Sequence, residues 1–207
     1  EYDLEENTGL KIKGIKTLEF KDVSFSYDGK KQVLNNMNFK LESGDVVGII
    51  GPSGSGKSTI IDIILKIWDT YSGEVLINEV ELKDINRASY YEHMSLVEQE
   101  PFIFRDTILR NIQFEDNKIN EKVLNMSEIS EMVENKKDKL NHSLTTGGGN
   151  LSGGEKQRIA LARALYTDAD ILILDEFTSA LDNETEEKIV KNIEKLRDDG
   201  KIVIIIT

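Results

Sequence analysis

The sequence predicts an α/β fold built around a mostly parallel β-sheet, with a smaller antiparallel β region near the N-terminus. Short continuous apolar runs at residues 45–50, 171–174 and 202–206 are typical of strands buried on both faces of a parallel sheet. Segments with the apolar spacing of helices separate these runs. Alternation of strands and helices along one chain predicts an open α/β sheet.

Composition narrows the class of protein. The chain has 207 residues and a net charge of −12, from 26 basic and 38 acidic side chains, and 39% of its residues are hydrophobic. This balance is globular, and the acidic excess disfavours nucleic-acid binding. The absence of cysteine excludes disulfides and zinc ribbons. No apolar run approaches the ~18 residues of a membrane span, and no signal peptide opens the chain, so we expect a soluble cytoplasmic domain.

The first elements are predicted to be β-strands. Residues 1–16 are polar and indicate a lead-in segment, whereas alternation begins at Thr17 and predicts two short strands. The alternating apolar residues are Leu18, Phe20, Val23, Phe25 and Tyr27. Asp28-Gly29 predicts a turn, and residues 33–41 a returning strand.

Helices and a hairpin follow. Residues 57–68 predict a buried helix that is apolar nearly all round, and residues 74–77 and 80–82 a hairpin around Asn78-Glu79. Helical spacing recurs between Val123 and Ile129. The remaining predicted helices are residues 154–165 and the amphipathic segment 184–197, which Gly200 ends.

Residues 51–58, with the sequence GPSGSGKS, form the clearest functional motif. They match G-x-x-x-x-G-K-[ST] between a predicted strand and a predicted helix, which is the setting that a phosphate-binding loop requires. The glycines let backbone N–H groups point at an anion beside the positive helix N-terminus. Lys57 would reach the β- and γ-phosphates, and the Ser58 hydroxyl would ligate Mg²⁺. The alternative is a Gly-Ser-rich turn that carries a lysine by chance.

Two carboxylates follow the apolar run 171–174. Asp175 and Glu176 therefore lie at the carboxyl end of a predicted strand, where open α/β sheets bind ligands. Asp175 could hold Mg²⁺, and Glu176 could polarise a water molecule in line with a γ-phosphate. Alone, such an acidic pair is more often a helix N-cap, but beside a phosphate loop the catalytic interpretation is favoured.

Residues 151–158, with the sequence LSGGEKQR, narrow the class further. Ser152, Gly153 and Gly154 at a helix start form a second anion-binding turn, or else an ordinary N-cap with loop glycines. The motif lies between the phosphate loop and the Asp175-Glu176 pair. In that order, the chain from Thr17 to Thr207 resembles the nucleotide-binding domain of ABC transporters. The resemblance implies a P-loop NTPase core with an inserted helical subdomain.

The resemblance implies roles for individual residues. Tyr27 would stack on adenine near Val33, Gln99 would join Mg²⁺ and the attacking water to the membrane-domain interface, and residues 179–182 would run between two sites of a dimer. Ser152 to Gly154 would bind the γ-phosphate of ATP held by a partner domain. In isolation, Tyr27 could be a strand aromatic and Gln99 a surface residue. The implied ATP contacts in the phosphate loop are Gly51, Ser53, Gly54, Ser55, Gly56, Lys57, Ser58 and Thr59.

The sequence after Gln99 resembles the exporter branch of the family. Exporter domains of this kind follow their own membrane spans in a half-transporter. We therefore expect residues 1–16 to be a linker from a membrane domain, residues 17–207 the nucleotide-binding domain, and residues about 100–165 its helical subdomain. The domain would lie at the cytoplasmic face of the membrane.

Several positions depart from the family pattern. Glu155 stands where glutamine is commoner, Phe177 where proline or alanine is usual, and Glu79 where glycine is usual. Thr146 replaces a glutamate that the family links to coupling with the membrane domains. The family histidine that would follow Thr207 is not in this sequence, and neither His93 nor His142 matches it. We therefore expect MgATP binding with weak hydrolysis.

The resemblance implies a motor domain that dimerises with a copy or a homologue around two MgATP and drives export through membrane spans. An alternative is a soluble ABC ATPase acting on ribosomes or DNA, and another is a module in which ATP only holds a dimer together. A P-loop kinase is disfavoured because it has no use for residues 151–155. The sequence does not predict the exported substrate.

Overall fold

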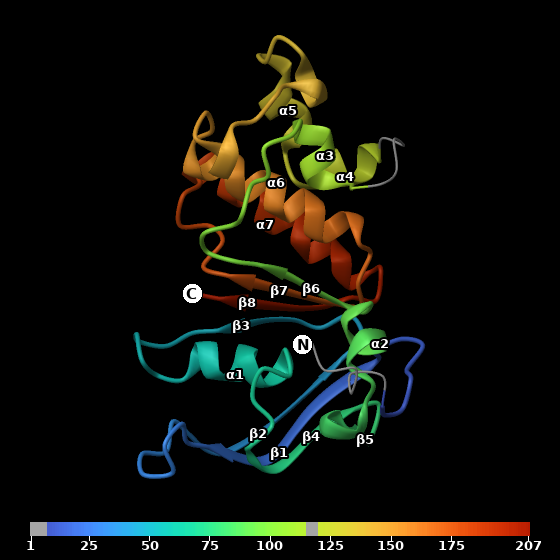
Figure 1. Cartoon of the computed structure of the whole chain (residues 1–207), viewed down its shortest axis with the longest axis vertical. Helices are drawn as coiled ribbons and strands as arrows, with labels where there is room; N and C mark the ends of the chain where they lie inside the picture. Colours follow the sequence, from blue (N-terminus) through green and yellow to red (C-terminus); the bar gives the residue numbers. More distant parts are fainter. Residues whose placement is uncertain (1–7, 115–119) are drawn as a thin grey trace, which may run out of the picture.

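A computed structural model describes residues 8–114 and 120–207 and arranges them around two four-stranded sheets (Figure 1). The first sheet is antiparallel and has the strand order β2-β1-β4-β5. Its strands are β1 (Thr17–Phe25), β2 (Leu34–Glu42), β4 (Ser72–Ile77) and β5 (Val80–Glu81). The first seven residues of the expected linker lie outside the described residues.

The second sheet is parallel throughout and has the order β3-β8-β7-β6. Its strands are β3 (Val46–Ile49), β6 (Met94–Val97), β7 (Ile171–Asp175) and β8 (Ile202–Ile206). The two sheets confirm the predicted fold class. The expectation that residues 45–50 are buried on both faces is wrong, because within the described ranges β3 pairs with β8 alone and the following Ile50 is 83% exposed.

Helix α1 (Lys57–Ile64) lies between the two sheets (Figure 1). Its isoleucines join a single apolar core with residues of both sheets, among them Phe20 and Ile204. The predicted helix 57–68 is too long, because Lys66 takes a left-handed conformation with φ of 54°. The Lys66 ammonium donates to the carbonyl of Ile85 at 2.6 Å.

Strand β1 is one bulged strand, so the prediction of two short strands is wrong. Its pairing register shifts between Phe20 and Val23, where Asp22 has φ of 50°. The backbone of Gly73 lies close to this bulge, and a Cβ there would come within 2.5 Å of the Asp22 carbonyl oxygen. The bulge changes the inward–outward alternation within the strand, which explains why the sequence pattern looks interrupted.

Two helices cover the other face of the parallel sheet, α6 (Gly153–Tyr166) and α7 (Asn183–Glu194) (Figure 1). Buried Leu161 and Ile189 pack there against Leu172 of the sheet. The amphipathic prediction for α7 is confirmed, since Ile189 and Ile193 are buried and Glu184 pairs with Lys188 at 3.0 Å. The helix continues as the short 3₁₀ segment η5 (Lys195–Arg197).

Shorter helices pack against α6 on its side away from the sheet and form the upper part of Figure 1. They are α3 (Ile108–Ile112), α4 (Glu121–Met126), α5 (Ile129–Glu134), η3 (Lys139–Asn141) and η4 (Thr146–Gly148). Two further short elements, η2 (Leu82–Asp84) and α2 (Arg87–Tyr91), follow the antiparallel sheet. A separate apolar cluster, including Ile108, Ile129 and Ile159, holds α3, α5 and α6 together.

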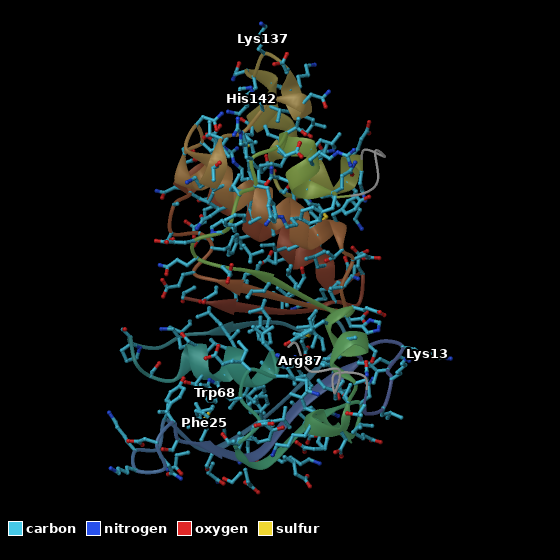
Figure 2. The ribbon with its side chains drawn as sticks, in the orientation of Figure 1. Lys13, Phe25, Trp68, Arg87, Lys137 and His142 are labelled. Atoms are coloured by element: carbon cyan, nitrogen blue, oxygen red, sulfur yellow. The ribbon has the colours of Figure 1, made fainter. Side chains whose placement is uncertain are left out.

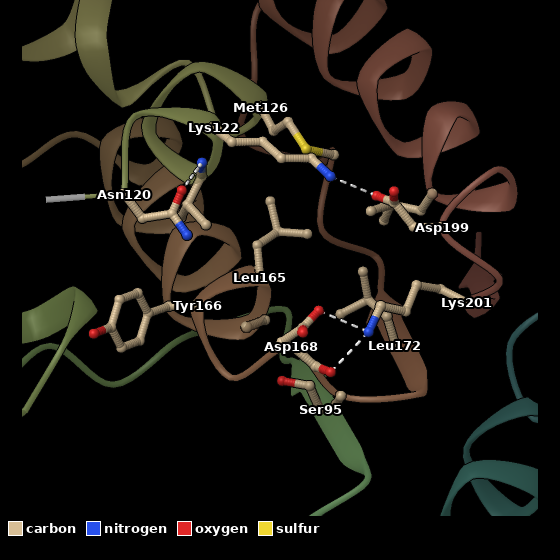
Figure 3. Close-up of a pocket in the computed structure, with 14 residues that line it drawn as sticks. Ser95, Asn120, Lys122, Met126, Leu165, Tyr166, Asp168, Leu172, Asp199 and Lys201 are labelled. Carbon is tan, nitrogen blue, oxygen red and sulfur yellow. Dashed lines mark hydrogen bonds and ion pairs between the residues drawn. The ribbon is translucent and has the colours of Figure 1, made fainter. Parts of the chain in front are cut away.

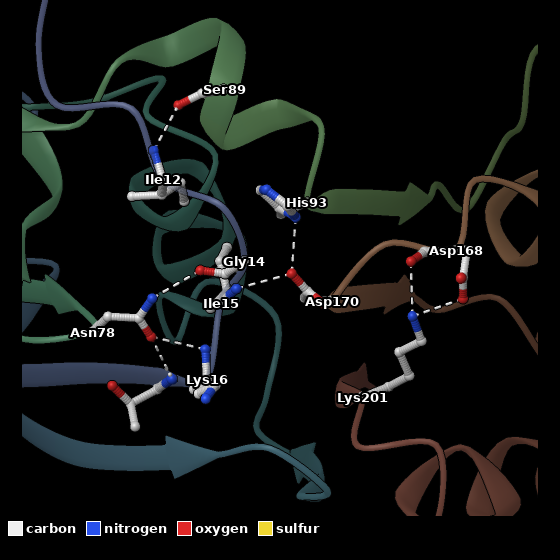
Figure 4. A network of polar contacts seen from close by, with 11 residues as sticks. Ile12, Gly14, Ile15, Lys16, Asn78, Ser89, His93, Asp168, Asp170 and Lys201 are labelled. Carbon is white, nitrogen blue, oxygen red and sulfur yellow. Dashed lines mark hydrogen bonds and ion pairs between the residues drawn. The ribbon is translucent and has the colours of Figure 1, made fainter.

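A polar network ties the segment 8–16 to both sheets (Figure 4). The Asp170 carboxylate, just before β7, accepts from the Ile15 N–H at 2.8 Å and lies 2.8 Å from Nδ1 of His93. In the turn between β4 and β5, the Asn78 side chain donates to the Gly14 carbonyl and accepts from the Lys16 N–H, both at 2.8 Å. These contacts fix the path of the chain as it enters β1.

Candidate functional site

The loop between β3 and α1 has the conformation expected of an anion cradle. Gly54 and Gly56 have positive φ values of 78° and 96°, and Gly56 precedes α1 with no side-chain cap. A Cβ on Gly56 would lie 2.8 Å from Cδ2 of Leu34, so both space and backbone conformation require glycine. The Lys57 ammonium donates to the Gly51 carbonyl at 2.5 Å, which folds the lysine back over the loop.

A cavity of about 340 Å³ joins this loop to the carboxyl end of β7. It brings together most of the residues predicted to bind nucleotide, and Gln99 and Ser152 to Gly154 are not among its lining residues. The lining residues are Tyr27, Val33, Pro52, Ser53, Gly54, Gly56, Lys57, Ser58, Thr59, Asp175, Glu176 and Ile206. Gly51 and Ser55 lie against each other within the same loop.

Asp175 ends β7 inside this cavity. Partial burial raises the pKa of its carboxyl, the charge of Glu176 adds to the rise, and the ammonium of Lys57 opposes it. A bound cation would relieve this unfavourable clustering of negative charge. The hydroxyl of Ser58 lines the same cavity, so a hydroxyl oxygen and a carboxylate face one space.

Glu176 follows the strand with φ of 43°, an uncommon conformation for a residue with a side chain. Its N–H donates to the Ile206 carbonyl at 3.1 Å, which ties the turn to β8. Its Oε2 accepts from Nε2 of Gln99 at 2.7 Å. The structure therefore brings Gln99 to the cavity through Glu176 although Gln99 does not line it.

Tyr27 is 53% exposed at the cavity and is held from two sides. Its hydroxyl lies 2.8 Å from Oγ1 of Thr59, and its ring makes edge contacts with Phe25 at 4.9 Å and Trp68 at 5.5 Å. Figure 2 shows Phe25 and Trp68 close together beside α1. Trp68 was not among the predicted site residues, because the turn at Lys66 that precedes it contains no glycine or proline.

The Ser152 turn begins α6 with a capping box. The Ser152 hydroxyl accepts from the Glu155 N–H at 3.2 Å, and the Glu155 carboxylate accepts from the Ser152 N–H at 2.7 Å. The turn packs closely on the loop after Glu176, since a Cβ on Gly153 would lie 2.9 Å from Cβ of Ala180. Gly154 approaches the Ala180 carbonyl equally closely.

The structure does not place the Ser152 turn in the phosphate-loop cavity of its own chain. Ser152 lines a separate polar cavity of about 480 Å³ with Asp182, and Gly153 lines another of about 600 Å³ with Gln99. Buried Gln157, which the sequence analysis did not single out, donates to the Gln99 carbonyl at 3.4 Å. The turn and the Gln99 segment are thus neighbours across the second of these cavities.

A further cavity, of about 260 Å³, lies between α4, α6 and β7 and contains none of the predicted site residues. Figure 3 shows its two ion pairs, Lys122 with Asp199 and Lys201 with Asp168, each at 2.7 Å. Its floor includes apolar Leu165 and Leu172. The ammonium groups of Lys122 and Lys201 are both paired with carboxylates, whereas a phosphate site needs cations that can contact the phosphate.

A glycine-rich loop between a parallel strand and a helix, facing two carboxylates at the sheet edge, defines the class of P-loop nucleotide-binding proteins. Within that class, the family model described as ABC transporter matches residues 34–179. This match covers more than half of the chain. The chain therefore belongs to the ABC transporter family, and this membership implies nucleotide binding.

Individual relatives are exporters. The chain is 38% identical to the ATP-dependent lipid A-core flippase of Haemophilus influenzae over 194 residues, which are 91% of this chain and 33% of the flippase. It is 35% identical to the beta-(1→2)glucan export ATP-binding/permease protein NdvA of Rhizobium etli over 209 residues, 98% of this chain and 36% of that protein. These matches do not favour a non-transport ABC ATPase.

A solved structure of a bacterial Atm1-family ABC exporter with ATP bound has the same fold, with a TM-score of 0.87 and 30% identity over 97% of this chain and 36% of that one. The predicted resemblance to exporter-type nucleotide-binding domains is confirmed. The chain spans about a third of the length of these relatives. Within the described residues, no helix is long and apolar enough to span a bilayer.

Proposed function

We propose that this chain is the ATP-hydrolysing motor domain of an ABC exporter and that it dimerises, with a copy or a homologue, around two MgATP. The observation that carries the proposal is the cavity that joins Lys57 and Ser58 to Asp175 and Glu176. The printed names of the relatives, which include a flippase and a glucan exporter, support export as the process driven. Residues 17–207 would form the motor domain, with residues about 100–165 as its helical subdomain.

Nucleotide binding would use two ends of the cavity. At one end Tyr27, held in place by Thr59 and Trp68, offers an aromatic ring for adenine. At the other, Lys57 would leave the Gly51 carbonyl for the β- and γ-phosphates, and backbone N–H groups would point at the phosphate oxygens. The residues assigned to this cradle are Gly51, Ser53, Gly54, Ser55, Gly56, Lys57, Ser58 and Thr59.

The donor set fits Mg²⁺. Ser58 and Asp175 bring a hydroxyl and a carboxylate to one cavity, and Gln99 uses its amide nitrogen on Glu176 and keeps its amide oxygen for a cation. Burial and the neighbouring charge of Glu176 raise the pKa of Asp175, and a bound cation would offset both effects. When bound, Mg²⁺ would neutralise charge on the phosphate oxygens.

Glu176 would orient and polarise the attacking water. Its carboxylate is fixed at Oε2 by Gln99, which leaves Oε1 free of that bond to accept a proton from water. The Glu176 backbone is fixed by its hydrogen bond to the Ile206 carbonyl, and the residue lines the nucleotide cavity. A positioned general base of this kind accelerates a reaction by ~10²–10⁴-fold.

The Ser152 turn would complete the site of the second domain. It has an exposed helix N-terminus and a serine hydroxyl, and it lies outside the nucleotide cavity of its own chain. Ser152, Gly153 and Gly154 would bind the γ-phosphate of ATP held by the partner. Each ATP then bridges two domains, so binding favours the closed dimer and hydrolysis removes that preference.

The remaining partners would be a membrane domain, in the same full-length protein, and an exported substrate of unassigned chemistry. The motor domain would then lie at the cytoplasmic face of the membrane. The test is the sequence of the native gene on both sides of this segment. About six apolar spans upstream would support a half-transporter, and their absence would point to a separately encoded ATPase.

Glu176→Gln tests the dimer directly. Removing the carboxylate should leave ATP affinity unchanged and trap an ATP-bound dimer, measured by sedimentation with and without MgATP. Lys57→Ala should abolish ATP binding and the dimer together. Glu187→Gln makes the same chemical change on the exposed face of α7 and is the control. It should neither trap the ATP-bound dimer nor reduce ATP binding. A Glu176→Gln protein that stays monomeric at saturating ATP would refute the dimer model.

A further inference from the structure

An ion pair joins the segment after α5 to the first turn of α6. The Lys136 ammonium lies 2.7 Å from Oε1 of Glu155, and only 16% and 19% of these side chains are exposed. The Lys136 N–H also donates to the Val133 carbonyl at 3.0 Å, which fixes its backbone to the end of α5. This pair is among the most buried ion pairs in the described part of the chain.

The same carboxylate holds the Ser152 turn. Glu155 uses Oε1 for Lys136 and Oε2 for the Ser152 N–H, each at 2.7 Å. Burial alone would raise the pKa of Glu155, but the hydrogen bonds from Lys136 and the Ser152 backbone outweigh it and keep the pKa below its ordinary value. The carboxylate is therefore ionised at neutral pH and bonded on both oxygens.

The two contacts of the Glu155 carboxylate, with the Ser152 N–H and with Lys136, differ in whether they require its negative charge. A glutamine at position 155 could still accept the Ser152 N–H through its amide oxygen, so the cap itself does not require a charge. It would, however, turn an NH₂ group toward Lys136 and leave the ammonium without its acceptor. The negative charge of Glu155 is thus specifically matched to Lys136.

Other charged side chains lie around the pair, and among the described residues the buried Nε of Arg158 has no hydrogen-bond partner. Lys188 on α7 is shared by Glu131 and Glu184 at 3.3 and 3.0 Å, and a guanidinium nitrogen of Arg158 donates to the Glu128 carbonyl at 3.5 Å. All but Glu128 line the same polar cavity as Ser152. Lys136 is the cation that contacts the capping carboxylate.

We propose that Lys136 is a positioning residue for the Ser152 turn. By fixing the Glu155 carboxylate, whose Oε2 accepts the Ser152 N–H, it holds the Ser152 hydroxyl in place for the partner's γ-phosphate, and it couples that turn to the position of α5. The inference rests on the proposed function, because the role of the Ser152 turn in binding the partner's ATP is part of that proposed function. Preorganisation of this kind lowers the ordering cost of binding.

The test compares dimerisation with monomer ATP affinity in a Glu176→Gln background. Lys136→Met should weaken the ATP-dependent dimer about tenfold, the expected order for losing one charge-assisted hydrogen bond that is not fully buried. Lys136→Arg should restore most of it. Binding of ATP by the monomer, read from a fluorescent ATP analogue, should not change. Lys137→Met removes the same charge from an exposed neighbour and is the matched control.

Glu155→Gln keeps the cap acceptor and breaks only the ion pair, so it reports on the proposal even if Lys136→Met does not fold. It should weaken the dimer to the same extent, and the double variant should add no further loss. If Lys136→Met dimerises as its parent does, the positioning role is overturned. If Lys136→Met does not fold, unchanged dimerisation of Glu155→Gln overturns it instead. Failure of the Glu176→Gln parent to dimerise with ATP would instead refute the proposed function.

Discussion

The amide of Gln99 donates a 2.7 Å hydrogen bond to the carboxylate of Glu176, across 77 positions of sequence. The bond joins the loop after β6 to the end of β7. It makes the geometry of Glu176, the proposed general base, depend on the segment that leads into the helical region.

Gln99→Ala should reduce the rate of ATP hydrolysis by about tenfold to a hundredfold, because Glu176 loses the donor that orients it. Nucleotide affinity in the absence of Mg²⁺ should stay the same. Single-turnover hydrolysis and an ATP titration measure the two quantities. Glu100→Ala, at the adjacent exposed position, is the control. An affinity loss with an unchanged rate would show that Gln99 acts in binding rather than in catalysis.

Tyr27→Ala should weaken ATP binding about tenfold, since stacking of a base on an aromatic ring contributes about 1–3 kcal/mol. Tyr27→Phe keeps the ring, loses only the contact with Thr59, and should change affinity by less than about threefold. Because the chain has a single tryptophan, and Trp68 touches the Tyr27 ring, ATP should also change intrinsic fluorescence. No fluorescence response at saturating ATP would place adenine elsewhere.

Phe177→Ala should lower the free energy of unfolding by about 3–5 kcal/mol. Phe177 is 1% exposed and packs in the core between the parallel sheet and the helices α6 and α7. Phe102→Ala, at a ring that is 58% exposed, should cost less than about 1 kcal/mol. Urea unfolding of the two variants measures the difference. Equal losses would contradict the assigned packing of Phe177.

The Glu155 carboxyl should make stability depend on acid pH. Its folded-state pKa lies below the ordinary value of 4.5, so its contribution is complete above pH 4.5 and is lost as the pH falls through the folded-state pKa. The stability difference between the parent and Glu155→Gln, measured by urea unfolding, should therefore be largest near neutral pH and shrink as the pH falls through the lowered pKa of Glu155. A constant difference across this range would exclude the carboxyl as its source.

The family and the fold class of this protein could be predicted from its sequence alone. The phosphate loop, the Asp175-Glu176 pair and the Ser152 turn are local patterns, because each depends on neighbouring residues that set a loop or a helix start. The buried runs 171–174 and 202–206 were found for the same reason, since continuous apolar strands need no knowledge of their partners.

Which of these local patterns meet depends on the packing of elements that are far apart in the sequence. The left-handed turn at Lys66 places Trp68 on Tyr27, and the edge position of β3 leaves Ile50 exposed. Lys136 and Glu155 are paired because α5 packs on α6, and their spacing in the sequence does not predict this contact. Conformations near a residue follow from local sequence, whereas pairings between distant residues follow from how buried faces pack together.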